Sequence, residues 1–124
     1  MKIKNIQNLN CNLNVIENLK NKNFVTKRIF FLNSYKKCIR GNHAHKKCTQ
    51  IFISLKGNIK IFIKNRKGSK KILLKEFKKI IKISPMNWVK IEMEKNQTLM
   101  VICDKDFSER DYIRSYDNFL KIIK

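Results

Sequence analysis

The stretch Arg40-Gly41-Asn42-His43-Ala44-His45 decides the fold that we predict for this chain. It holds both histidines of the sequence, two residues apart, and an alternating apolar run follows at residues 50–55. If one strand includes the pair, both imidazoles point to the same face and lie about 6 to 7 Å apart. Two groups with an ordinary pKa of about 6.5 would then share one pocket. The alternative is that both histidines are surface residues, because two lysines follow them.

Length and composition predict one soluble domain that spans residues 1–124. A chain of 124 residues is long enough to bury one core and too short for two. No apolar run approaches the ~18 residues that cross a membrane. The N-terminus is interrupted by asparagines and lacks the apolar segment of a secretion signal. We therefore expect a cytoplasmic protein with no membrane partner.

The formal net charge of +20 raises the question of nucleic-acid binding. The excess is nearly all lysine, and it accompanies many Ile and Asn residues, whose codons are also rich in A and T. Arginine, the better reader of phosphates and bases, is scarce. We therefore predict no nucleic-acid partner. A lysine-rich barrel that binds polynucleotides, with a steep dependence on salt, is the alternative.

The four cysteines show neither a C-x-x-C pair nor the spacing of a zinc finger. We expect them to be reduced thiols. Cys48 and Cys103 fall within or beside strand-like runs, which predicts that both are buried as small apolar groups.

Short strand-like segments separated by Gly, Asn and Pro predict an all-β sandwich or barrel. The predicted strands are 24–32, 49–55, 58–64, 71–75, 80–83, 88–93 and 98–104. We expect 49–55 and 58–64 to form a hairpin through Gly57. Residues 1–23 are expected to form one or two edge strands. Residues 111–124 have apolar positions at helical spacing and predict a short helix packed on the sheet.

The spacing around the histidines resembles the first motif of the cupins, small jelly-roll barrels of two sheets. In that motif H-x-H precedes a glutamate and, six residues later, a glycine. Gln50 stands here at the glutamate position and Gly57 at the glycine position. A neutral amide is a poor ligand for a first-row metal, and no third histidine follows Pro85. We predict a metal-free site whose imidazoles are free to transfer protons.

Beyond this motif, the sequence resembles the nucleotide-sugar 3,4-ketoisomerases. These are cupins that act on dTDP-4-keto-6-deoxy-D-glucose in the routes to 3-amino-3,6-dideoxy sugars of bacterial surface glycans. The matching stretches are 27–31, 40–47 with Gln50, Gly57, 85–88 and 111–120. The pairing of R-G-x-H-A-H-K with a C-terminal D-Y-I-R-x-Y-D-x-F makes the resemblance specific.

The resemblance implies an isomerase without a cofactor, a dTDP-linked 4-keto-6-deoxy sugar as substrate, and a homodimer in which residues 1–23 add to the neighbouring sheet. In this reaction a proton leaves C3, an enediol forms and a proton arrives at C4, which requires a base and an acid beside the sugar. The resemblance assigns His43 as the base at C3. It assigns His45 as the partner that shuttles or delivers a proton, and the reverse order stays open.

Four further residues are candidates for binding the substrate. Arg40 and Arg28 would hold the diphosphate or polarise a keto oxygen. Gln50 would hydrogen-bond the sugar or orient an imidazole, and Trp88 would form a wall of the pocket. The alternatives are a surface salt bridge for Arg40, a solvent-facing strand position for Arg28, a satisfied core amide for Gln50 and a core position for Trp88.

The sequence departs from the family at four positions. Phe30 and Phe31 stand where tyrosines are common, Val89 follows the tryptophan where His or Arg is common, and Asn10 stands near the first strand turn where a bulky polar residue is common. These differences leave open whether the product has the gluco or the galacto configuration at C4. A nucleotide-sugar-binding cupin without catalysis and a related deoxysugar epimerase are the alternative functions.

Overall fold

A computed structural model describes residues 1–8, 10–17 and 23–124. Its strands are β1 (Lys2–Gln7), β2 (Asn12–Glu17), β3 (Arg28–Asn33), β4 (Cys38–His45), β5 (Gln50–Lys56), β6 (Ile59–Asn65), β7 (Gly68–Leu74), β8 (Ile80–Ile83), β9 (Trp88–Met93), β10 (Thr98–Cys103) and β11 (Tyr112–Ile113). A 3-10 turn, η1 (Glu109–Asp111), precedes β11, and the helix α1 (Tyr116–Ile122) follows it.

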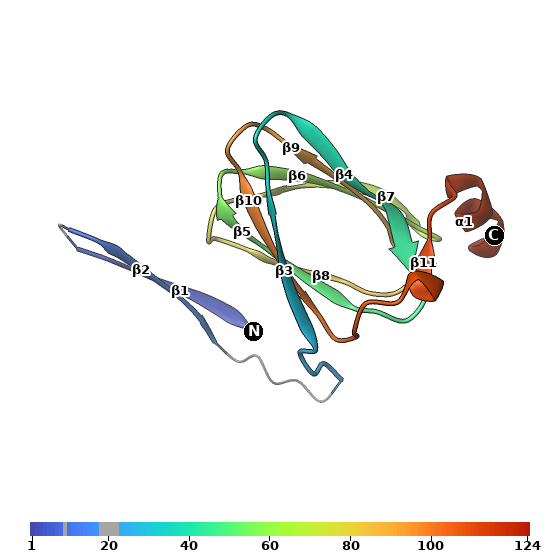
Figure 1. Ribbon diagram of the computed structural model, residues 1–124, viewed down its shortest axis with the longest axis horizontal. Helices are drawn as coiled ribbons and strands as arrows, with labels where there is room; N and C mark the ends of the chain where they lie inside the picture. The colour runs from blue at the N-terminus through green and yellow to red at the C-terminus, as the bar shows by residue number, and fades with distance from the viewer. Residues whose placement is uncertain (9, 18–22) are drawn as a thin grey trace.

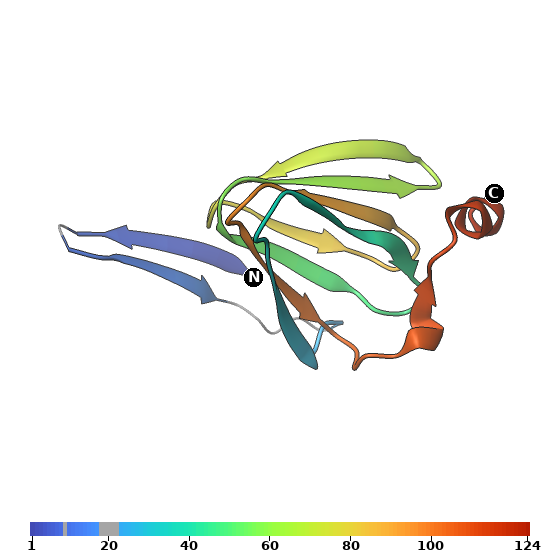
Figure 2. The same ribbon diagram turned by 45° about the horizontal axis from the view of Figure 1, so that its top comes forward.

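Two antiparallel sheets face each other and enclose the core. One has the strand order β3-β10-β5-β8 and the other β11-β4-β9-β6-β7. Figures 1 and 2 show these layers, with α1 beyond one end and the β1–β2 hairpin projecting from the opposite side. The predicted all-β jelly-roll of the cupin type, with a short C-terminal helix, is confirmed. No helix in the described ranges is long and apolar enough to cross a membrane.

The central strands of the four-stranded sheet, β5 and β10, are buried on both faces. The inner face of this sheet contributes Phe52 and Val101 to the core between the sheets. Its outer face carries Ile51 and Ile53, which pack with the partly buried Ile3 of the β1–β2 hairpin. This double burial explains the dense apolar run of β5, since a strand covered on both faces has no solvent side.

The predicted hairpin of residues 49–55 and 58–64 is wrong. The two strands are present as β5 and β6, but β5 pairs with β10 and β8, whereas β6 pairs with β7 and β9. The turn at Gly57 therefore carries the chain from one sheet to the other. A Cβ on Gly57 would lie 2.8 Å from the Gln97 side chain. Alternation and a turn residue predict two successive strands, but they do not state which sheet each strand joins.

The C-terminal helix is shorter than the predicted span of 111–124. It begins at Tyr116, where Ser115 caps it by accepting a hydrogen bond from the Asn118 amide. The preceding residues pair instead with the edge of β4, Tyr112 opposite His45. The first apolar residues of the predicted helix, Tyr112 and Ile113, therefore form the strand β11, although the apolar spacing of the whole segment is helical. The strand predicted for residues 24–32 is also shorter at its start, because β3 begins at Arg28.

The N-terminal prediction of edge strands agrees with the β1–β2 hairpin, while residues 9 and 18–22 of that span lie outside the described residues. The four cysteines are free thiols, and Cys48 and Cys103 are buried, as predicted.

Candidate active site

A β-bulge in β4 brings Arg40 and His43 onto the same face of the sheet. The pairing with β9 shifts between Gly41 and His43, so that Asn42 is an extra residue on β4. Residues three apart on a regular strand point to opposite faces, and one inserted residue restores the shared face. Arg40 and His43 accordingly lie opposite residues of β9 that face the barrel interior.

The dipeptide Gly41-Asn42 supplies the backbone that this bulge requires. Both residues have positive φ, 83° and 56°, which Gly and Asn adopt at lower cost than other residues. A Cβ on Gly41 would lie only 2.8 Å from the carbonyl oxygen of Val89. A larger residue at this position would therefore push β4 away from β9.

His43 lines a cavity of about 380 Å³ inside the barrel. Its polar lining residues are Arg40, His43, Gln50, Tyr112 and Arg114. Apolar side chains such as Phe30, Leu32 and Val101 form the facing wall on β3 and β10. The cavity thus places proton-transferring groups against a wall that excludes water.

His45 lies behind His43 and does not line the cavity. The two ring centroids are 5.1 Å apart, and His45 is 5% exposed. Its Nδ1 lies 2.8 Å from a carboxylate oxygen of Asp111, so that Nδ1 carries the proton and donates it in a hydrogen bond. The other nitrogen, Nε2, is buried without a hydrogen-bond partner. The structure brings the two predicted imidazoles together but gives only His43 access to a ligand.

Asp111 holds His45 in this tautomer. Its carboxylate also accepts hydrogen bonds from the backbone amides of Lys47 at 2.7 Å and Cys48 at 3.3 Å. Burial by itself raises the pKa of Asp111, but the hydrogen bonds from His45 and the two amides lower it overall. Asp111 lies within the C-terminal match, but the sequence assigns it no role, because its approach to His45 depends on the pairing of β11 with β4.

Both imidazoles are neutral at pH 7. Burial, the neighbouring His45 and the charge of Arg114 lower the pKa of His43 to about 4. Burial also lowers the pKa of His45, although the hydrogen bond to Asp111 opposes the shift. A neutral imidazole accepts a proton, so the resting site contains bases and no imidazolium acid.

Tyr112 packs against both histidines. Its ring centroid lies 4.9 Å from that of His43 and 4.3 Å from that of His45. The Arg114 guanidinium lies 4.2 Å from the centroid of the tyrosine ring. The register in which β11 pairs with β4 fixes this arrangement, because it places Tyr112 directly opposite His45. This residue was also part of the C-terminal match without an assigned role.

Gln50 is buried at the glutamate position of the cupin motif. Its Nε2 donates to the Cys103 sulfur at 3.5 Å, and its side chain lines the cavity. Hydrogen bonds from the Cys48 thiol and Gln50, together with the nearby Arg28 charge, lower the pKa of Cys103 although burial opposes this. The Gln50 amide therefore has a hydrogen-bond partner inside the protein and also lies at the wall of the cavity.

Arg28 points into the barrel and not toward solvent along its strand. Its guanidinium carbon lies 5.5 Å from the Phe30 ring centroid, and its Nε is buried without a hydrogen-bond partner. Burial by itself lowers the pKa of Arg28, but Cys103 and the Tyr112 side chain raise it overall. Arg28 therefore keeps its positive charge beside the Tyr112 phenol.

Metal binding at this site is disfavoured by the chemistry of its donor set. The residues of the cupin motif offer two imidazoles and an amide, which is a poor set for a first-row metal. Ligand atoms of His45, Cys48 and Asp111 lie within 4.8 Å of one another. Hydrogen bonds already occupy the Asp111 carboxylate in this group. A site without a resident metal stays a prediction.

Arg40 and Trp88 lie on opposite faces of the five-stranded sheet. Arg40 is exposed, lines the His43 cavity and forms no salt bridge with another residue of the described ranges. Trp88 packs on α1, with its ring centroid 5.6 Å from that of Phe119. It lines a second cavity, of about 670 Å³, on the outer face. Trp88 therefore does not form a wall of the His43 cavity, whereas Arg114 lines both cavities.

Comparison with known proteins identifies the family. The sequence matches the family described as "FdtA: WxcM-like, C-terminal" over residues 1–124. It is 32% identical over 110 residues to the TDP-4-oxo-6-deoxy-alpha-D-glucose-3,4-oxoisomerase of Aneurinibacillus thermoaerophilus, which covers 87% of this chain and 79% of that protein.

Solved structures show the same likeness. WlaRA, a TDP-fucose-3,4-ketoisomerase from Campylobacter jejuni, has a TM-score of 0.84 and 32% identity, covering 100% of this chain and 93% of its own. QdtA, a sugar 3,4-ketoisomerase from Thermoanaerobacterium thermosaccharolyticum in complex with TDP, has a TM-score of 0.86 and 31% identity, covering 98% and 90%. The motifs, the jelly-roll and these matches agree, and the chain belongs to the FdtA-type family of cupin sugar 3,4-ketoisomerases.

Proposed function

We propose that this protein moves the ketone of dTDP-4-keto-6-deoxy-D-glucose from C4 to C3 by proton transfer through an enediol. The observation that supports this most is the neutral His43 imidazole on the wall of a cavity, backed by the buried His45–Asp111 pair. A carbon next to a carbonyl is weakly acidic, and a positioned neutral imidazole accepts its proton. A variant of QdtA has been solved in complex with TDP-4-keto-6-deoxyglucose, which supports this substrate class.

His43 is the base at C3 in this proposal, because its ring faces the cavity. Its Nδ1 lies 3.2 Å from the Gly41 carbonyl oxygen, which favours a proton on Nδ1 and leaves Nε2 as the acceptor. His45, whose ring centroid lies 5.1 Å from that of His43, is the partner that shuttles or delivers a proton in this proposal. Its own Nδ1 is held by Asp111, so its free Nε2 is basic as well.

The remaining polar residues bind the substrate in this proposal. Arg40 lies at the exposed part of the cavity lining and would hold the diphosphate. Gln50 would contact the sugar. Arg28 lies behind the cavity residues Phe30 and Tyr112, and its charge would stabilise negative charge near the keto oxygens from there. The product, a 3-keto sugar, has the chemistry that an aminotransferase needs to form a 3-amino-3,6-dideoxy sugar.

Incubation with freshly prepared dTDP-4-keto-6-deoxyglucose in deuterium oxide tests the proposal. We expect a 3-keto product, trapped by an aminotransferase, and deuterium at C4 by NMR. Deuterium entering C3 or C5 with inversion and no ketone shift would indicate an epimerase. Binding of TDP without any exchange would indicate a protein that binds nucleotide sugars without converting them, and either result would contradict the proposal.

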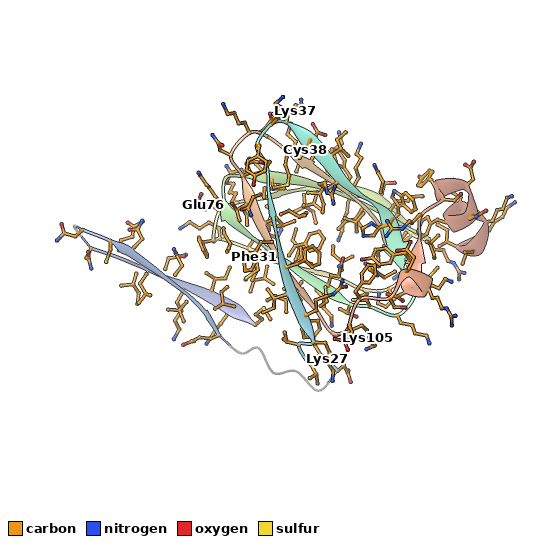
Figure 3. The ribbon with its side chains drawn as sticks, viewed as in Figure 1. Lys27, Phe31, Lys37, Cys38, Glu76 and Lys105 are labelled. Carbon is orange, nitrogen blue, oxygen red and sulfur yellow. The ribbon has the colours of Figure 1, made fainter. Side chains whose placement is uncertain are left out.

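We further propose that two copies of this chain form a homodimer through the N-terminal hairpin and β3. The hairpin projects from the barrel, and its Ile6 and Leu13 are 53% and 54% exposed. β3 is an edge strand, and Phe31, midway along it in Figure 3, is 53% exposed. Unpaired edges and exposed apolar side chains of this kind are covered in a symmetric dimer.

Light scattering after size-exclusion chromatography tests the dimer. The wild-type protein should have twice the mass of the chain, and Leu13→Asp should shift the mass toward a monomer. Ile122→Asp is the matched control, because Ile122 is 52% exposed on α1, away from the hairpin. A monomeric wild-type protein would contradict the proposal.

A further inference from the structure

The cavity that holds His43 contains a phenol that the reaction above does not use. The sequence has three tyrosines, and only Tyr112 lines this cavity. Tyr35 is 83% exposed, and Tyr116 lines the outer cavity. The aromatic side chain that β3 contributes to the cavity, Phe30, has no hydroxyl.

A ketone shift moves a proton between two oxygens as well as between two carbons. O4 of the sugar begins as a carbonyl and ends as a hydroxyl, while O3 does the reverse. One group that first donates and then accepts a proton can serve both oxygens. Among the polar residues of the cavity, arginine does not release its proton and an amide does not accept one readily. His43 is already engaged with the carbons, which leaves Tyr112.

We propose that the Tyr112 hydroxyl carries the proton from O3 to O4, in a relay that rests on the proposed isomerase function. His43 takes the C3 proton, the C–H electron pair forms the C3=C4 bond, and O4 becomes an anion. The phenol gives its proton to O4, and the phenolate then takes the proton of the O3 hydroxyl. As O3 forms its carbonyl, the C3=C4 electron pair takes a proton from the His43 imidazolium at C4. Every group returns to its starting state, and no oxidant or cofactor is consumed.

The surroundings of Tyr112 favour a transient phenolate. The titratable or charged groups that face its ring are Arg28 on β3, His43 and His45 on β4, and Arg114 after β11, with Glu109 of η1 paired to Arg114. Two of these are permanent cations, and the two imidazoles are neutral or positive. A phenolate next to fixed positive charge is stabilised at the moment it forms.

The first experiment separates the oxygen relay from the carbon chemistry. Tyr112→Phe should lower the rate of the ketone shift by about 10²-fold or more, the range of a positioned acid–base group. Exchange of the C3 hydrogen with deuterium should fall much less, because His43 is intact. Tyr116→Phe is the matched control, since it removes a phenol from the outer cavity. A proportional fall in both rates, or a ketone shift at the wild-type rate, would overturn the relay.

The second experiment leaves the shape of the side chain unchanged. In the variant Tyr35→Phe/Tyr116→Phe, Tyr112 is the last tyrosine, so growth on fluorotyrosine labels only this phenol. Fluorine changes how readily the phenol gives up its proton and takes one back, so we expect the rate of the ketone shift to change while the rate of C3 hydrogen exchange does not. An unchanged rate of the ketone shift would overturn the relay. Failure of the isomerase proposal itself is recognised separately, because the unlabelled wild-type protein would then produce no 3-keto sugar.

Discussion

The two walls of the cavity that His43 lines differ in their chemistry, and this difference explains why the His43 imidazole is neutral. The wall formed by β4 and β11 carries Arg40, His43 and Tyr112, while β3 and β10 present Phe30 and Val101. Burial against apolar groups disfavours the charged imidazolium, and it is the main cause of the His43 pKa of about 4. The apolar wall therefore sets the protonation state of the polar wall.

Removal of the base from the polar wall should have the largest effect. His43→Asn should lower kcat by about 10²- to 10⁴-fold, with TDP affinity by calorimetry close to wild type. Lys46→Asn, an exposed change close by on the chain, is the control. A variant that keeps more than about a tenth of the wild-type rate would show that the base is another group.

Loss of the carboxylate behind the polar wall should have the next largest effect. Asp111→Asn replaces the charged acceptor that fixes His45 with a neutral amide and weakens a hydrogen bond to a charged group worth about 1.5–3 kcal/mol, so kcat should fall by up to about a hundredfold. The pKa of His45 should fall further, because the negative charge and the strong hydrogen bond that oppose its lowering are lost. NMR titration of the imidazole measures this.

Asp104→Asn is the matched control for this change. Asp104 is also buried and accepts a backbone hydrogen bond, from Thr49 at 2.8 Å, but its carboxylate pairs with Lys105 and not with a histidine. It should lower stability without moving the His45 titration. An identical His45 titration in the wild-type protein and in Asp111→Asn would show that the Asp111 carboxylate does not control the pKa of His45.

A polar residue in the apolar wall should move the pH dependence. His43 must be neutral to act as a base, so kcat/KM should fall as pH drops through about 4 in the wild-type protein. Phe30→Ser admits water, raises the pKa of His43 toward its ordinary value of about 6.5, and moves this acid limb upward. Phe31→Ser, on the exposed face of the same strand, should leave the limb in place. An unchanged limb in Phe30→Ser would show that this wall does not control the imidazole.

The smallest effect is expected at the exposed part of the polar wall. Arg40→Lys keeps the charge but loses the bidentate hydrogen bonding to a diphosphate, so KM should rise by up to about tenfold with kcat unchanged. Arg66→Lys, at the turn between β6 and β7, is the control. A fall in kcat with KM constant would place Arg40 at the reacting carbons instead.

The histidines of the polar wall were predictable from the sequence, but the roles of Asp111 and Tyr112 beside them were not. Two histidines at a spacing of two, before an alternating run, predict a shared face because strand geometry is local. Asp111 and Tyr112 lie far along the chain, and their apolar neighbours have helical spacing. Only the pairing of β11 with β4 brings them to His45.

The same limit explains the errors. Gly57 was correctly predicted as a turn, yet its strands enter different sheets, because a turn fixes the chain reversal and not the partner of each strand. Trp88 was a candidate for a wall of the substrate pocket, with a core position as the alternative. The register of β9 puts its side chain on the outer face, where α1 covers it.

The sequence by itself determined the strand-rich architecture, the family and the pair of imidazoles, because alternation, turn residues and motif spacing act over a few neighbouring residues. The tertiary structure alone decided which imidazole reaches the cavity, which carboxylate holds the other and which wall keeps His43 neutral. These depend on residues brought together by sheet pairing, and burial and hydrogen bonding between distant segments have no local signature in the chain.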